Sequence, residues 1–304
     1  MIARVQRLLV LALLMLATGF LVTRWQAGQP TWALLGAVAI LGGHSVFLAI
    51  EMVWLVAARG NDPTPKASMR TLVAAWAHEC LAMPQVFYWR QPWRHRLHAD
   101  HLPADAAGRR GVLLVHGFVC NRGVWNSWMP RLRAQGVPYL AVTMEPVLGS
   151  IDRHVAAIEA AVQRLEQTTG LAPLLVAHSM GGLSVRRWLA EQPPSRVHGV
   201  VTLGSPHQGT ALAALAFSIN GRQVRRDSPW LQTLAAREAQ SRERELTGVY
   251  AGFTCLYGDC DNVVFPPRTA TLPGADNLLV AGAAHVALVD RVEAWQAVQQ
   301  RLAA

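Results

Sequence analysis

The chain has 304 residues, 52% of them apolar, and its formal net charge of +9 comes almost wholly from arginine. This length accommodates one catalytic domain and an additional segment. The arginines are scattered without interleaved aromatic residues, so no nucleic-acid partner is expected. The four cysteines have neither the spacing of a metal site nor the density of a disulfide-stapled secreted domain, and free thiols are expected.

The additional segment is the N-terminal region, residues 1–59, which contains two long apolar stretches. A helix of about 20 apolar residues crosses the hydrocarbon core of a bilayer. Transmembrane helices are therefore predicted at about 4–23 and 32–58, the second containing only His44 and Glu51 as ionisable side chains. A secretory signal peptide is the alternative interpretation, because basic residues precede the first apolar run.

Basic residues flank both predicted helices. They lie before the first helix, in the turn, and after the second helix: Arg4, Arg7, Arg24, Arg59, Lys66 and Arg70. The positive-inside tendency places both ends of the pair in the cytoplasm. The sequence thus predicts a protein of the bacterial inner membrane whose large domain faces the cytoplasm, where its basic surface would attract anionic head groups.

The second predicted part is a soluble domain of residues 68–304, joined through a linker at 60–67 that contains two prolines. A helix is expected over 68–83, ending before Pro84. Residues 85–110 are expected to form a polar surface hairpin. Its histidines, His95, His98 and His101, complete no ligand pattern, so neither a metal nor a cofactor is expected.

From residue 111 the chain alternates between short apolar runs and helical patterns. Strands are expected at 111–115, 139–142, 174–176, 197–203, 253–257 and 277–280, and helices at 123–135, 151–168, 181–191 and 286–302. Strands separated by helices imply a mostly parallel sheet with helices on both faces, which is the α/β class.

The residues at 177–182, Ala-His-Ser-Met-Gly-Gly, follow a predicted strand and open a predicted helix. A serine on such a turn holds its hydroxyl above the sheet, and the residues two positions away on either side must be small. Ala177 and Gly181 meet this requirement. Ser179 is therefore the predicted nucleophile.

A serine hydroxyl needs a base to take its proton and an acid to orient that base. His285 follows the last predicted strand and Asp261 follows the strand before it, which gives the chain order Ser, Asp, His. Asp259 remains a rival for the acid. His178, adjacent to the nucleophile, is not expected to reach the serine hydroxyl.

Residues 111–302 resemble the α/β-hydrolase superfamily, and specifically bacterial triacylglycerol lipases and esterases. The resemblance rests on the motif at 116–118 (His-Gly-Phe), on 177–182, on 204–210 (Gly-Ser-Pro-His-Gln-Gly-Thr), and on Asp261 and His285. The segment 204–210 discriminates best, because it looks like that of lipases acting on acyl esters. The acid loop is also similar, with Asp261 one residue before a Val-Val pair.

The resemblance also implies an oxyanion hole, because the tetrahedral intermediate carries a negative oxygen that needs hydrogen-bond donors. The backbone N–H groups of Met180 and Phe118 are the expected donors. Gly117 would leave room for the acyl group, and His116 would hold the loop through hydrogen bonds.

A lid-like insertion is predicted at about 210–250, with an apolar helical piece at 211–219 and a charged helix extending to about Leu246. An ordinary cap helix is the alternative. The expected function is hydrolysis of carboxylic esters, lipid-like ones, through an acyl-enzyme at a Ser-His-Asp triad beside a membrane. An acyltransferase or thioesterase with the same triad, and a catalytically silent membrane-associated scaffold, are the competing hypotheses.

Overall fold

The computed structural model describes residues 1–240 and 248–304, and its centre is a single six-stranded sheet. All neighbouring strands are parallel, in the order β2-β1-β3-β4-β5-β6. The strands are β1 (Val112–Val115), β2 (Tyr139–Ala141), β3 (Leu174–His178), β4 (Gly199–Leu203), β5 (Phe253–Gly258) and β6 (Asp276–Val280). The predicted α/β class with a parallel sheet is confirmed.

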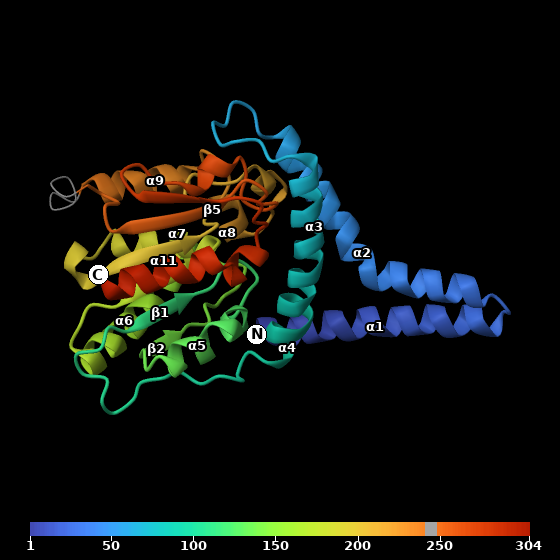
Figure 1. Ribbon diagram of the computed structural model, residues 1–304, viewed down its shortest axis with the longest axis horizontal. Coiled ribbons are helices and arrows are strands. Elements are labelled where there is room, and N and C mark those ends of the chain that lie inside the picture. The colour runs from blue at the N-terminus through green and yellow to red at the C-terminus, as the bar shows by residue number, and fades with distance from the viewer. Residues whose placement is uncertain (241–247) are drawn as a thin grey trace.

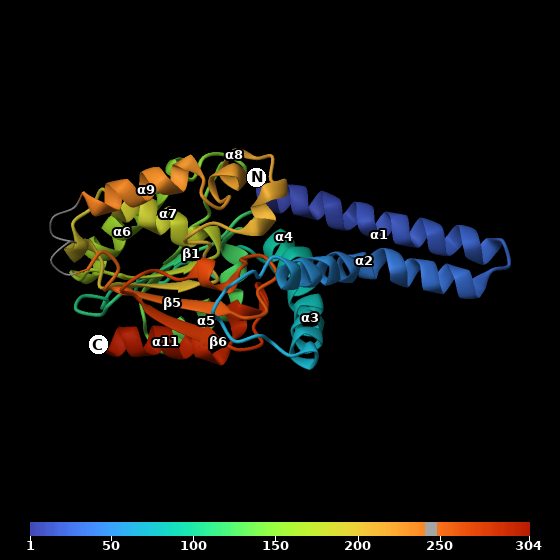
Figure 2. The ribbon, with the colours of Figure 1, turned by 90° about the horizontal axis from the view of Figure 1, so that it is seen from above.

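Helices cover both faces of the sheet (Figures 1 and 2). One face packs against α5 (Met129–Ala134) and α11 (Val292–Ala303), and the other against α6 (Val155–Thr169) and α7 (Met180–Leu189). The first layer contains Trp128 and Trp295, whose rings meet edge to face with centroids 5.2 Å apart. Every residue of β1 to β5 is buried. The ends of these strands are therefore held in place, and the loops described below begin there.

The N-terminal region forms a pair of long antiparallel helices that projects away from the sheet domain (Figure 1). These are α1 (Ile2–Gln26) and α2 (Pro30–Ala57), close to the predicted bounds, and each is long and apolar enough to cross a bilayer. Most of their side chains are exposed, so neither is a core helix of the domain. The next helix, α3 (Met69–Pro84), runs across the base of the pair (Figure 1).

The expected surface hairpin at 85–110 is wrong. The chain instead continues from α3 through Pro84 into a π-helical turn, η1 (Gln85–Arg90), and then into α4 (Gln91–Trp93). Proline cannot donate the i→i−4 hydrogen bond, and a π turn is one way in which a helix accommodates that loss. After α4, His101 pairs with Tyr139 in an isolated antiparallel bridge beside β2.

Several predicted helices are divided by local capping. The 123–135 helix consists of a 3₁₀ turn, η2 (Arg122–Ser127), and then α5, because Pro130 is suited to the first turn of a new helix and not to the interior of an old one. Similar short turns are η3 (Ile151–His154) before α6, η4 (Pro194–Arg196) after α7, η6 (Pro267–Ala270) after β5 and η7 (Ala287–Asp290) before α11.

The insertion at 210–250 is also divided. The predicted apolar helix at 211–219 is a 3₁₀ turn, η5 (Ala211–Leu215), followed by α8 (Ile219–Gln223), because the Ser218 hydroxyl accepts from the Gly221 N–H and starts a new helix. The charged helix is α9 (Pro229–Ala239). Its predicted extension to Leu246 lies outside the described residues.

Candidate active site

Ser179 lies at the turn between β3 and α7 with a positive φ of 56°. A β carbon on Gly181 would lie 2.5 Å from the His116 carbonyl oxygen, so only glycine allows the helix to start so close to the loop after β1. The Ser179 N–H donates to the Leu203 carbonyl at 2.9 Å. The serine is thereby fixed in a conformation that few non-glycine residues adopt.

The structure brings His285 and Asp261 together beside this serine. His285 Nε2 lies 2.9 Å from Ser179 Oγ, and its Nδ1 lies 3.0 Å from both carboxylate oxygens of Asp261. Asp261 also accepts from the N–H groups of Val263 and Val264, which fixes its orientation. The rival Asp259 instead accepts from the Gly282 N–H at 2.6 Å.

The surroundings shift the pKa values of two neighbouring histidines, His285 and His178, in opposite directions. Burial alone would lower the pKa of His285, but the charge of Asp261 and its hydrogen bond outweigh burial and raise it. Burial and the neighbouring His285 hold the pKa of His178 well below its usual range. The His178 ring is tilted by 42° against that of His285, with 4.7 Å between ring centroids, and its Nε2 contacts the His285 carbonyl oxygen, not the serine. His285 is thus the ring suited to accept a proton.

The loop after β1 borders the serine from the other side. His116 accepts from the Met144 N–H through Nε2 at 2.9 Å, and its Nδ1 lies 2.9 Å from the Gly117 carbonyl oxygen. A β carbon on Gly117 would lie 2.6 Å from Ser179 Cβ. The space that this glycine leaves is therefore occupied by Ser179, where room for an acyl group was expected from the sequence.

Both expected oxyanion donors lie beside the serine. Met180 is the first residue of α7, where a backbone N–H has no partner inside the helix. Phe118 lines the cavity above Ser179 and is 38% exposed. Met180 and Phe118 follow the carboxyl ends of β3 and β1, respectively. Parallel α/β sheets bind their ligands at this end of their strands.

A family model described as alpha/beta hydrolase fold matches residues 111–301. The chain belongs to this family. The superfamily inferred from the motifs is thereby confirmed. No curated protein matches the sequence at a significant level.

Two solved structures share this α/β-hydrolase fold. The mature form of the Bacillus licheniformis lipase BlEst2 has 17% identity and a TM-score of 0.56, with 66% of this chain and 95% of that one covered. Aspergillus fumigatus lipase B has 18% identity and a TM-score of 0.55, with 68% and 56% covered. At such identities the likeness extends to the fold alone.

The cavity beside Ser179 and His285 has a volume of about 350 Å³, and one part of its wall comes from the N-terminal helices. Phe47 and Leu48 of α2, Met83 of α3 and Phe87 of η1 supply apolar side chains opposite Ser179 and His285. All four precede the segment that matches the family. Sequence reasoning missed this wall, because an apolar residue in a long apolar helix carries no sign of which neighbour it faces.

Two carboxylates from the same helices also reach the α/β-hydrolase site. Glu51 is 5% exposed and accepts from the Asn262 amide at 2.6 Å. Glu79 is fully buried and accepts from the N–H groups of Val286 and Ala287. Of the two, only Glu51 stands out in the sequence, as a lone acid in an apolar run.

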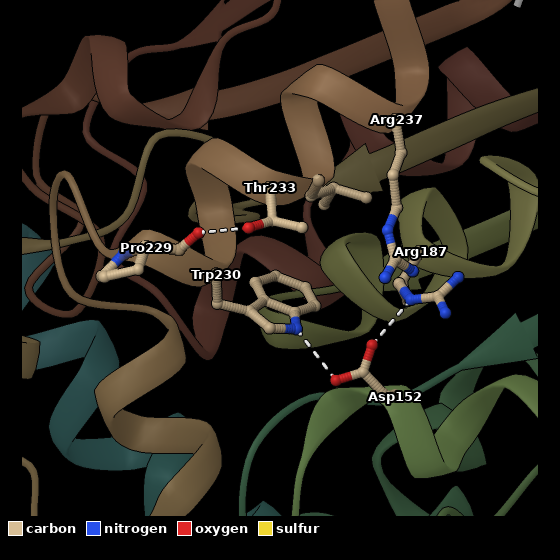
Figure 3. Close-up of a pocket in the computed structure, with 7 residues that line it drawn as sticks. Asp152, Arg187, Pro229, Trp230, Thr233 and Arg237 are labelled. Atoms are coloured by element: carbon tan, nitrogen blue, oxygen red, sulfur yellow. Dashed lines mark hydrogen bonds and ion pairs between the residues drawn. The ribbon is translucent and has the colours of Figure 1, made fainter. Parts of the chain in front are cut away.

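Among the described residues of the insertion, those that border the α/β-hydrolase site lie in its first part. Leu212 of η5 lines the cavity, whereas α9 packs against α7 through Leu231 and Leu234. A separate hollow of about 400 Å³ lies beside α9 (Figure 3). There Trp230 and Arg187 both donate to Asp152, so these polar groups pair with one another away from Ser179.

Proposed function

We propose that this α/β-hydrolase cleaves carboxylic esters through an acyl-enzyme. The observation that carries the proposal is the continuous relay from Ser179 Oγ through His285 to Asp261, with distances of 2.9 and 3.0 Å. These are hydrogen-bond distances suited to proton transfer from a nucleophile to an oriented base.

In the proposed reaction, Ser179 Oγ attacks the ester carbonyl carbon while its proton passes to His285 Nε2. The backbone N–H groups of Phe118 and Met180 stabilise the oxyanion. The C–O bond to the alcohol breaks, and the alcohol leaves with the proton from His285. Water then attacks the acyl-enzyme with His285 as base, releasing the carboxylic acid and restoring Ser179.

We further propose that the substrate is lipid-like and comes from a bilayer that α1 and α2 span. The wall of the cavity supports this, since Phe47 and Leu48 belong to α2 itself. Beside the base of α2 lies η5, and the chain there exposes Leu215 and Phe217, the latter by 86%. An exposed apolar surface continuous with membrane-spanning helices is suited to contact with lipid.

The contacts of α1 with the domain support an anchor over a cleaved signal peptide. Gln6 donates to the Val119 carbonyl, and Arg7 donates to the Pro92 carbonyl at 2.6 Å. Both ends of the pair are proposed to lie in the cytoplasm, beside the inner membrane of a bacterium, following the basic flanks. Reporter fusions at the two termini test this orientation.

The test of the activity is labelling of membranes with a fluorophosphonate probe, comparing the wild type with Ser179→Ala and His285→Ala. Loss of labelling in both variants is expected, together with loss of hydrolysis of chromogenic esters. A series of acyl chain lengths then separates esterase from lipase. Folded wild-type protein that neither labels nor hydrolyses, in detergent and in lipid, contradicts the proposal.

Acyl transfer is the second candidate, because a cavity walled by a membrane helix gives a lipid alcohol the same access to the acyl-enzyme as water. Product analysis with an added lyso-lipid acceptor distinguishes the two. A new ester as the main product favours the transferase, and free acid alone favours the hydrolase. Thioester substrates in the same assay test a thioesterase.

A further inference from the structure

Three consecutive backbone N–H groups after β6 are each held by a side chain. The His285 N–H donates to Asn262 Oδ1 at 3.2 Å. The Val286 and Ala287 N–H groups donate to the two carboxylate oxygens of Glu79, at 2.8 and 2.9 Å. The position of the histidine loop therefore depends on a residue of α3, more than 200 positions earlier in the chain.

The acid loop is held in the same way from α2. Glu51 accepts from Asn262 Nδ2 at 2.6 Å, and Asn262 directly follows Asp261. The same Asn262 side chain receives the His285 N–H through its oxygen. One buried amide thus connects Glu51 to both loops that form the relay.

The loop after β1, which carries the expected oxyanion donor Phe118, is held from α1. Gln6 Nε2 donates to the Val119 carbonyl oxygen at 3.2 Å and to Gln91 Oε1 at 3.1 Å. Gln91 Oε1 in turn accepts from the Asn121 N–H. Val119 has a positive φ of 54°, which a β-branched residue adopts only when its surroundings impose it.

We propose that Glu51 and Glu79 are positioning residues, so that the helices before the family domain are a built-in part of the catalytic site as well as an anchor. This inference rests on the proposed function. A carboxylate at position 79 accepts two hydrogen bonds at once, whereas an amide would turn its NH₂ group toward one of the two N–H donors. The histidine loop then loses its fixed distance to Ser179.

The negative charges of Glu51 and Glu79 have a second effect on the relay, because both favour the protonated form of His285. His285 faces Asp261 from the acid loop, Glu51 from α2, Glu79 from α3 and His178 from β3. Burial raises the pKa of Glu79 to about 6, so the group is mostly ionised at neutral pH. Its negative charge favours the imidazolium that forms when His285 takes the serine proton.

The test measures kcat, KM and their pH dependence for a soluble short-chain ester, with the full chain in detergent. Glu79→Gln is expected to lower kcat about 10- to 100-fold, the loss that a displacement of about 1 Å produces, with KM changed less than about twofold. The pH midpoint of kcat/KM is expected to move to lower pH, because a negative charge near His285 is removed.

Position 51 supplies a paired comparison in case Glu79→Gln does not fold. Glu51→Gln keeps an oxygen that can accept from Asn262 and is expected to retain kcat within about threefold, whereas Glu51→Leu loses that acceptor and falls about tenfold. Glu238→Gln is the matched control. It removes the charge of another buried carboxylate, which pairs with Arg186 at 2.7 Å, and is expected to lower the melting temperature without changing kcat or the pH midpoint.

The outcomes separate this inference from the proposed function. A folded wild type that neither takes the fluorophosphonate label nor hydrolyses esters, in detergent and in lipid, refutes the function itself. A labelled wild type whose Glu79→Gln variant, corrected for folded protein, keeps both kcat and the pH midpoint refutes the positioning role. Equal kcat values for Glu51→Gln and Glu51→Leu refute it for Glu51.

Discussion

Replacing Gly117 with alanine is expected to reduce kcat/KM for ester hydrolysis about 100-fold while leaving the fold intact. The added β carbon would lie 2.6 Å from Ser179 Cβ and 3.0 Å from the His178 carbonyl oxygen. Carbon atoms in contact normally lie about 3.5–4.0 Å apart, so one of the two must move by about 1 Å.

The displaced group is expected to be Ser179, the proposed nucleophile, because its Cβ is the nearest atom and its backbone is already constrained at φ 56°. A misplacement of about 1 Å at a reacting centre costs about 100-fold in rate, which corresponds to about 2.7 kcal/mol in the activation free energy. Steric overpacking is also expected to cost about 1–3 kcal/mol in stability.

The assay compares kcat/KM and melting temperature for Gly117→Ala and Gly252→Ala. Gly252 is the matched control, because a β carbon there meets no atom within 4 Å and its φ is not in the left-handed region. The control is expected to retain its activity. Gly117→Ala that folds and keeps more than about half of the wild-type kcat/KM would refute the assignment of Ser179 as nucleophile in this geometry.

Three other predictions concern the relay, the core and the membrane. His285 accepts a proton only when it is neutral, and its pKa is raised, so kcat/KM should fall as pH decreases through a midpoint above 6.5. Asp261→Asn should move that midpoint to lower pH and lower kcat by about 10⁴. An unchanged pH profile in this variant would contradict the relay. Trp128→Ala should lower the free energy of unfolding by about 3–5 kcal/mol, since this fully packed ring contacts Trp125 and Trp295; a melting temperature within a degree of wild type would show otherwise. Phe217→Ser should slow hydrolysis of vesicle-borne esters severalfold and leave soluble esters unaffected, with equal loss on both substrates arguing against a lipid contact.

The sequence predicted the sheet and the serine turn because both depend on local rules. Buried parallel strands are continuous apolar runs, and the turn at Ser179 requires small residues two positions away on either side. Helix boundaries were less well predicted. A helix was expected to end before Pro84, and another to run through Pro130. Whether a proline ends a helix, widens it or starts a new one depends on what packs around it.

The loops around the site needed the tertiary structure. Asp259 and Asp261 are two residues apart on one loop, and which of them faces His285 follows from the bonds of Asp261 to the N–H groups of 263 and 264. A loop has no fixed periodicity, so spacing alone leaves both aspartates possible.

The sequence by itself determined that the chain is an α/β domain with a serine turn, preceded by two long apolar helices, because strand, turn and helix signals are each carried by neighbouring residues. Only the tertiary structure decided that α2, together with α3, lines the cavity and that Glu51 and Glu79 hold the loops beside Ser179. These contacts join residues more than 200 positions apart, and a hydrogen bond between such distant partners leaves no pattern in either segment.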